Sequence, residues 1–293
     1  MNHRIISRLD IKGPNLVKGI HLEGLRVLGD PTKFAEYYYN QGIDEIIYMD
    51  VVASLYGRNR LHKFISETAK NSFIPIAVGG GIRTLEDIKE ILRSGADKVV
   101  INTQAIKNPI FIAEAAKKFG SSTIVIAIEV IKQDNGKYFV FTDNGREHTG
   151  IDAEDWAQKV IELGAGEIIL TSIDNEGTGQ GFDNDIISRI AQMSPIPVIA
   201  HGGAGKKSQI SECFQIGKPD AIAVASILHY EAICKISHNF QERDEGNFQF
   251  ITNNNFIPPK YIEVASIPEI KSHLIESGIL IRPTSELGDL NHE

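Results

Sequence analysis

The sequence has few cysteines, no excess of positive charge and no long apolar run. Its 293 residues include two cysteines, Cys213 and Cys234, which are too few for a disulfide framework and stand in no metal-ligand spacing. We therefore expect a protein of the reducing cytoplasm, and we predict neither a metal nor a cofactor. A net charge of -8 argues against a nucleic-acid surface, although a local basic patch remains compatible with phosphate binding.

No apolar stretch approaches the length of a membrane span, and the N-terminus carries charge inside the first expected strand. This pattern predicts no signal peptide. With 42% hydrophobic and 23% charged residues, the chain is long enough to bury a large core. We expect one domain that spans residues 1–293.

Short β-branched runs alternate with amphipathic segments along the chain. Strands are expected at residues 4–11, 45–51, 74–79, 97–102, 123–130, 166–172, 196–201 and 220–225. Helices are expected at residues 31–41, 60–71, 84–94, 109–119, 152–164, 184–193 and 206–216. Strands that are apolar on both faces and are each followed by a helix predict a parallel sheet. Eight such units favour a closed (β/α)₈ barrel, with an open doubly wound sheet as the alternative.

The chain also repeats itself. I-P-I-A-V-G-G-G at 74–81 is similar to I-P-V-I-A-H-G-G at 196–203, and D-E-I-I-Y-M-D at 44–50 is similar to G-E-I-I-L-T-S at 166–172. The same spacing separates the two copies in both cases. A duplicated half-barrel explains this spacing and places the first and fifth strands opposite each other.

Two stretches break the alternation. Residues 131–150 are polar and contain two D-N-G turns, the first of which predicts a hairpin. Residues 237–263 form an aromatic, Asn-rich insertion after the eighth strand. Long loops of this kind are lids, binding loops or disordered segments. A last helix is expected at 267–277.

Two acids end apolar strands at the expected catalytic face. Asp10 follows the run R-I-I-S-R-L, and Glu129 follows S-T-I-V-I-A-I. Buried acids are rare unless they have a partner or a role, and the alternative here is a structural acid bonded to a loop. As a pair they can serve as general acid and general base, with burial raising at least one pKa toward neutrality.

Glycine-rich turns follow two strands, where glycine permits close backbone approach and the N–H groups of the next helix attract an anion. A tight turn without a ligand is the alternative. Polar or small residues also follow two further strands. Together with the glycine-rich turns, they favour two phosphate sites at opposite rims of the barrel, which suit a substrate with a phosphate at each end. The candidates are Gly80, Gly81, Asn102 and Thr103 at one rim and Gly202, Gly203, Ala225 and Ser226 at the other.

Three more residues complete the predicted phosphate-binding set. Lys18, in the connection after the first strand, is either a phosphate ligand or an ordinary solvated lysine. Glu176 and Gly177 follow the sixth strand. His201, directly before Gly202, is not part of this set, and it either contacts the ligand or fills space.

Four charged residues open strands at the opposite end of the expected barrel, where apolar packing is usual. They are Arg4, Glu45, Lys98 and Glu167. Charges of alternating sign at this place predict an ion-pair ring at the base of the channel, which serves as a docking surface or a gate. Snorkelling or ordinary paired surface charge is the alternative for any one of them.

Taken together, these motifs resemble those of the cyclase subunit of imidazole glycerol phosphate synthase, a (β/α)₈ enzyme family of histidine biosynthesis. The resemblance covers nearly the whole chain. Its motifs are R-I-I-x-x-L-D-I-K, L-V-K-G, G-D-P, D-V-V-A-S, V-G-G-G-I-R-T-L-E-D, G-A-D-K-V-V-I-N-T, L-G-A-G-E-I-I-L-T-S-I-D and I-P-V-I-A-H-G-G-A-G.

The resemblance implies an ammonia-dependent lyase and cyclase. A glutaminase subunit would dock on the N-terminal face of the barrel and release ammonia through the charged ring, which matches the family's gate. The implied substrate is a bis-phosphorylated aminoimidazole carboxamide ribonucleotide, cleaved to imidazole glycerol phosphate and a purine precursor. Asp10 and Glu129 would be the catalytic pair. One phosphate would bind at Gly81, Asn102 and Thr103 and the other at Gly203, Ala225 and Ser226.

Several residues depart from the family pattern. The family has Asp at Glu129 and Glu176, usually Cys at Arg8 and Ser at His201, and it lacks the insertion. One added methylene moves a carboxylate by more than ~1 Å, which can cost ~10²-fold in rate. Two alternatives therefore stand beside the cyclase: a divergent paralogue that handles ammonia in bacterial acetamidino surface-sugar biosynthesis, and a non-catalytic scaffold that activates a glutaminase.

Overall fold

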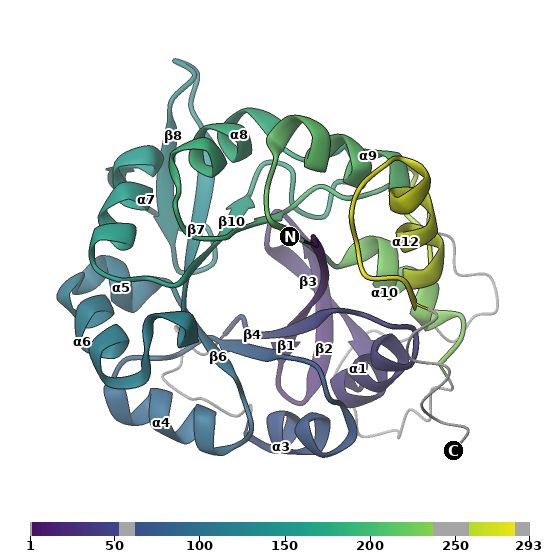
Figure 1. Cartoon of the computed structure of the whole chain (residues 1–293), viewed down its shortest axis with the longest axis horizontal. Helices are drawn as coiled ribbons and strands as arrows, with labels where there is room; N and C mark the ends of the chain where they lie inside the picture. Colours follow the sequence, from purple (N-terminus) through teal and green to yellow (C-terminus); the bar gives the residue numbers. More distant parts are fainter. Residues whose placement is uncertain (1, 53–61, 237–257, 285–293) are drawn as a thin grey trace.

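The structure is a computed structural model of the chain, and it describes residues 2–52, 62–236 and 258–284. Within this described part, eight parallel strands form a closed ring with helices outside it (Figure 1). In order around the ring the strands are β1 (Arg4–Lys12), β4 (Glu45–Asp50), β5 (Ile76–Gly79), β6 (Lys98–Ile101), β7 (Ile124–Lys132), β10 (Glu167–Ser172), β11 (Val198–His201) and β12 (Ala221–Val224). Pairing of β12 with β1 and of β7 with β10 closes the ring. The predicted (β/α)₈ barrel is confirmed.

Four of the described helices, α1, α4, α7 and α12, begin at a residue whose side chain caps the helix. Asp30 accepts a hydrogen bond from the Thr32 N–H at the start of α1, and Thr84 forms a capping box with Asp87 at the start of α4. The α-helices are α1 (Pro31–Asn40), α3 (His62–Asn71), α4 (Leu85–Arg93), α5 (Thr103–Lys107), α6 (Ile110–Phe119), α7 (Ala153–Glu162), α8 (Asn184–Met193), α9 (Lys207–Glu212), α10 (Ser226–Ile233) and α12 (Ile267–Glu276). A short 3₁₀ helix spans Ser121–Thr123, and a π-helical turn, Cys213–Gly217, continues α9.

Alternate residues of each strand face opposite sides, which separates two apolar layers. On β1, Ile5 and Leu9 belong to the layer between the strands and the helices. Ile6 belongs to a second cluster inside the barrel. Because Arg8 and Asp10 share the face of Ile6, β1 directs both charged side chains into the interior, where both are buried.

The connection between β1 and α1 contains a hairpin that the sequence pattern did not predict. Its strands are β2 (Asn15–Ile20) and β3 (Glu23–Gly29), and β2 pairs antiparallel with the end of β1. The turn is made by His21 and Leu22, which both have positive φ, of 54° and 61°. The usual Asn-Gly signal of such a turn is absent here, which explains the omission.

The polar stretch after β7 also folds as antiparallel strands. These are β8 (Tyr138–Thr142) and β9 (Glu147–Asp152), and β8 pairs with the extended end of β7. The hairpin around β8 projects from the ring in Figure 1. Most of the expected insertion at 237–263, namely residues 237–257, lies outside the described residues.

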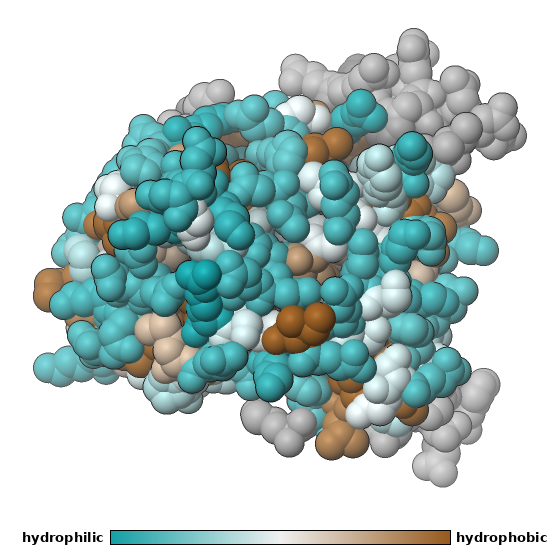
Figure 2. Space-filling view, turned by 90° about the horizontal axis from the view of Figure 1, so that it is seen from above, coloured by the Kyte–Doolittle hydropathy of each residue, from teal (hydrophilic) through white to brown (hydrophobic). Residues whose placement is uncertain are grey.

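The face seen in Figure 2 is mostly hydrophilic, with scattered hydrophobic residues. The core hydrophobic side chains lie instead in the two apolar layers, one inside the barrel and one between the strands and the helices. Among the described residues, no helix combines the length and the apolar character needed to cross a membrane.

Candidate active site

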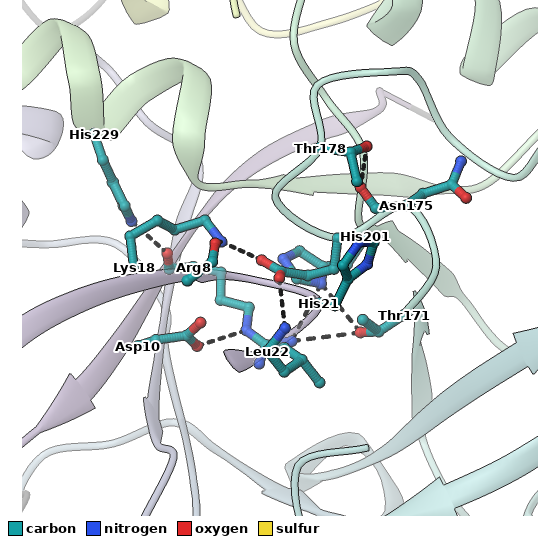
Figure 3. A network of polar contacts seen from close by, with 12 residues as sticks. Arg8, Asp10, Lys18, His21, Leu22, Thr171, Asn175, Thr178, His201 and His229 are labelled. Atoms are coloured by element: carbon teal, nitrogen blue, oxygen red, sulfur yellow. Dashed lines mark hydrogen bonds and ion pairs between the residues drawn. The ribbon is translucent and has the colours of Figure 1, made fainter. Parts of the chain in front are cut away.

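Asp10 lies near the C-terminal end of β1 with Arg8 as its partner. The Arg8 Nε donates to the Asp10 Oδ1 at 2.8 Å, and both side chains are buried. The same guanidinium crosses the interior to two strands, donating through Nη1 to the Thr171 Oγ1 at 3.4 Å and to the His201 Nδ1 at 3.2 Å (Figure 3). A salt bridge in this interior is little screened by water, so Asp10 and Arg8 act as one unit.

Arg8 and Thr171 were not among the site residues expected from the sequence. A signal was available for Arg8, since it stands two residues before Asp10 and so shares its face of β1. Thr171 gave none, because its contact with Arg8 depends on the closure of the barrel. His201 was singled out, and its Nδ1 also accepts from Thr171 at 3.1 Å. Burial, and then the charge of Arg8, hold the pKa of His201 well below its ordinary value, so the ring is neutral.

Glu129 lies on β7, across the barrel from β1, and is 3% exposed. Its Oε2 is buried and has no hydrogen-bond partner among the described residues. Burial raises the pKa of Glu129 to about 7, against the opposing effect of Arg8 and with a further rise from Asp10. A carboxyl with this pKa can both donate and accept a proton near neutral pH.

The first group of expected phosphate ligands shares a cavity with Glu129. This cavity has a volume of about 280 Å³, and its lining includes Gly80, Gly81, Asn102 and Thr103. Gly80 has a φ of +99°, and a Cβ there would lie 2.3 Å from the Asp50 carbonyl oxygen. Glycine is therefore required by the turn itself, and the turn leaves room beside the acid.

The second group lies on the other half of the barrel. Gly202, Gly203, Ala225 and Ser226 are all buried. Residues 173–183, which follow β10, lie against the two glycines, and the Gly181 N–H donates to the Gly203 carbonyl at 2.8 Å. The ring order thus places the two expected groups on opposite sides of Asp10 and Glu129, with the first lining a cavity and the second buried.

Lys18 and Glu176 form a buried ion pair. Lys18 also donates to the Gly19 carbonyl, and the second Glu176 oxygen accepts from the Leu22 N–H at 2.9 Å. Gly177 lies against the same hairpin, because a Cβ there would lie 2.5 Å from the Gly19 carbonyl oxygen. These contacts hold the β2–β3 hairpin against the residues that follow β10. That Lys18, Glu176 and Gly177 bind phosphate stays a prediction.

The four charges at the other end of the barrel meet in a ring. Arg4 pairs with Glu45 at 2.6 Å and with Glu167, while Lys98 pairs with Glu45 at 3.0 Å and with Glu167 at 2.9 Å. Each charge therefore has two partners of opposite sign. A cavity of about 320 Å³ reaches this ring and is lined by Arg4, Lys98 and Glu167.

The chain is a (β/α)₈ barrel with two buried acids, Asp10 and Glu129, in its interior. A family described as "Histidine biosynthesis protein" matches residues 4–234, and the chain belongs to this family. It is similar to the protein named "Imidazole glycerol phosphate synthase subunit HisF" from Legionella pneumophila, with 58% identity over 210 residues, which cover 72% of this chain and 99% of that one. The protein of the same name from Alkaliphilus metalliredigens is 45% identical over 243 residues, which cover 82% of this chain and 96% of that one.

The raised pKa of Glu129 predicts a cost in stability. Between its ordinary value of 4.5 and about 7 the folded chain binds a proton at Glu129 that the unfolded chain releases. The free energy of unfolding therefore falls as pH rises through this window. Glu129→Gln should stabilise the protein above pH 7 by up to about 3 kcal/mol and change little at pH 4.

Urea unfolding from pH 4 to pH 8 measures this difference. Glu114→Gln, an exposed carboxylate on α6, is the matched control and should follow the parent protein at every pH. If the free energies of unfolding of the parent and of Glu129→Gln changed with pH in parallel, Glu129 would be ionised alike in the folded and unfolded chains, contrary to the prediction.

Proposed function

We propose that this chain is an ammonia-dependent lyase and cyclase, the cyclase subunit of an imidazole glycerol phosphate synthase. The placement of Asp10 and Glu129 across one interior carries this proposal. The names of the relatives support it, and so do the glycine-rich turns on both halves of the barrel. The substrate is a bis-phosphorylated aminoimidazole carboxamide ribonucleotide, with one phosphate bound near Gly81 and Thr103 and the other near Gly203 and Ser226.

Bond cleavage and ring closure both need protons to be moved at the centre of such a substrate. Asp10, held by Arg8, supplies a fixed negative charge that stabilises positive charge developing on the attacking nitrogen. Glu129, with a pKa of about 7, can give a proton to a leaving group and take it back. Burial excludes bulk water from both acids and strengthens their action on the substrate.

Ammonia would arrive from a glutaminase subunit docked on the N-terminal face of the barrel. The charged ring lies at this face, and Ile6 and Ile169 belong to the apolar cluster inside the barrel. An apolar path suits neutral ammonia better than ammonium, because a charge pays a large desolvation cost there. We place the complex in the reducing cytoplasm, in line with two cysteines that are both free.

Asp10→Asn tests the catalytic assignment. It keeps the size of the side chain but removes the charge, so turnover with ammonium salt should fall by about 10²-fold or more. The assay follows consumption of the ribonucleotide by the purified chain. Asp155→Asn, an exposed acid at the start of α7, should keep the parent rate. An unchanged rate in Asp10→Asn would remove Asp10 from the chemistry and favour a scaffold role.

Lys98→Met tests the gate. It deprives Glu45 and Glu167 of a shared partner and should disturb the ring while leaving the distant acids in place. In the complex with a glutaminase, glutamine hydrolysis should exceed product formation, whereas turnover at saturating ammonium should stay within about twofold of the parent.

Lys89→Met, on the exposed face of α4, is the control for this variant and should keep hydrolysis and product formation equal. If Lys98→Met lowered turnover equally with glutamine and with ammonium, the substitution would disturb the barrel as a whole rather than the passage of ammonia.

A further inference from the structure

Arg8 joins three strands inside the barrel. It extends from β1 to Thr171 on β10 and His201 on β11, while its Nε binds Asp10. Its Nη2 is buried and has no hydrogen-bond partner among the described residues. Burial acts to lower the pKa of Arg8, but Asp10 and then Glu129 more than offset this, so the pKa is raised and the guanidinium stays charged.

The backbone beneath this guanidinium is also held. The Nε2 of His229 donates to the Arg8 carbonyl at 3.0 Å, and the Tyr38 hydroxyl donates to the His229 Nδ1 at 2.7 Å. Burial lowers the pKa of His229 to about 3, so the ring stays neutral and keeps this donor arrangement. Arg8 is thus fixed at its backbone and at the end of its side chain.

The two acids differ in their partners. Asp10 is paired with the charge of Arg8, whereas the Oε2 of Glu129 is unpaired and the residue lines the cavity. An acid in a salt bridge is engaged as an anion, while an unpaired buried acid is free to exchange a proton. The asymmetry follows from the position of Arg8, two residues before Asp10 on the same strand.

The surroundings of Glu129 contain charges of both signs. From β1 it faces Arg8 and Asp10, and from the segment after β10 it faces Glu176. Its neighbours in the sheet are uncharged, with Thr171 beside it on β10 and Phe141 on β8. Asn102 follows β6, and Asp143 beyond β8 accepts from Thr103 at 3.4 Å. Three further cations lie nearby, since Lys18 pairs with Glu176 and Arg83 and Lys107 line the same cavity as Glu129. Arg8 is the cation that acts to lower the pKa of Glu129, against the neighbouring carboxylates.

We propose that Arg8 is a positioning residue that assigns the two acids their separate roles, with Asp10 as the fixed anion and Glu129 as the group that exchanges protons with the substrate. This inference rests on the proposed function for its catalytic meaning. Its electrostatic claim, that Arg8 changes the pKa of Glu129, does not depend on that function. Without Arg8 the two carboxylates would share one interior with less positive charge, and Glu129 would hold its proton to higher pH.

The experiment is a direct titration of Glu129 by carbon NMR of protein labelled at the glutamate carboxyl carbon. The Glu129 signal is identified by its loss in Glu129→Gln. Arg8→Met, which nearly keeps the volume but removes the charge, should raise the midpoint by about one pH unit or more. Arg8→Lys should restore it to near the parent value. Arg93→Met, an exposed arginine on α4, should leave it unchanged.

Asp10→Asn gives an independent test should Arg8→Met fail to fold. With Asp10 neutral, its charge no longer raises the pKa of Glu129, and Arg8 is left to act on Glu129 and Glu176, so the midpoint should fall below the parent value. A midpoint that stays at the parent value in both variants, or in the one that folds, would overturn the proposal.

The pH dependence of ammonium-driven turnover completes the test. In Arg8→Lys the inflection should stay near that of the parent, while in Arg8→Met it should move to higher pH with the NMR midpoint. Absence of turnover in the parent protein, together with a shifted midpoint, would reject the cyclase and keep the role of Arg8. Turnover in the parent with an unshifted midpoint would reject the role of Arg8 and keep the cyclase.

Discussion

The parallel pairing that closes the barrel, between β12 and β1 and between β7 and β10, is the constraint on which the other features depend. Closure gives each strand an inner face that repeats every two residues. On β1 this face carries Arg4, Ile6, Arg8 and Asp10 in succession. One strand therefore supplies a member of the charged ring, part of the apolar lining and the partner of an acid that it also carries.

Placing charge inside a barrel has a cost, and the molecule meets it with partners. The ring gives each of its four charges two partners, Arg8 binds Asp10, and Lys18 binds Glu176. Buried pairs of this kind stabilise little in net terms, because desolvation offsets much of their attraction. Glu129 differs from these pairs, since its Oε2 has no hydrogen-bond partner among the described residues. Its raised pKa costs stability and leaves a group that can move protons.

Much of the fold could be predicted from the sequence, because apolar runs and caps act locally. All eight barrel strands lie where the β-branched runs predicted them. The β2–β3 hairpin could not be predicted, because its turn uses His21 and Leu22 at positive φ in place of glycine or asparagine. The catalytic roles of Asp10 and Glu129 stay predictions. The contact of Arg8 with Thr171 depends on which strands become neighbours, a property that no local pattern carries.

The two halves of the barrel are proposed to hold the two ends of one substrate over Asp10 and Glu129. A crystal structure of the chain soaked with inorganic phosphate tests this most directly. We predict two bound anions, one at the turn of Gly81 and Thr103 and one at the turn of Gly203 and Ser226, with both acids between them. A single anion, or anions bound away from these turns, would contradict a substrate held by a phosphate at each end.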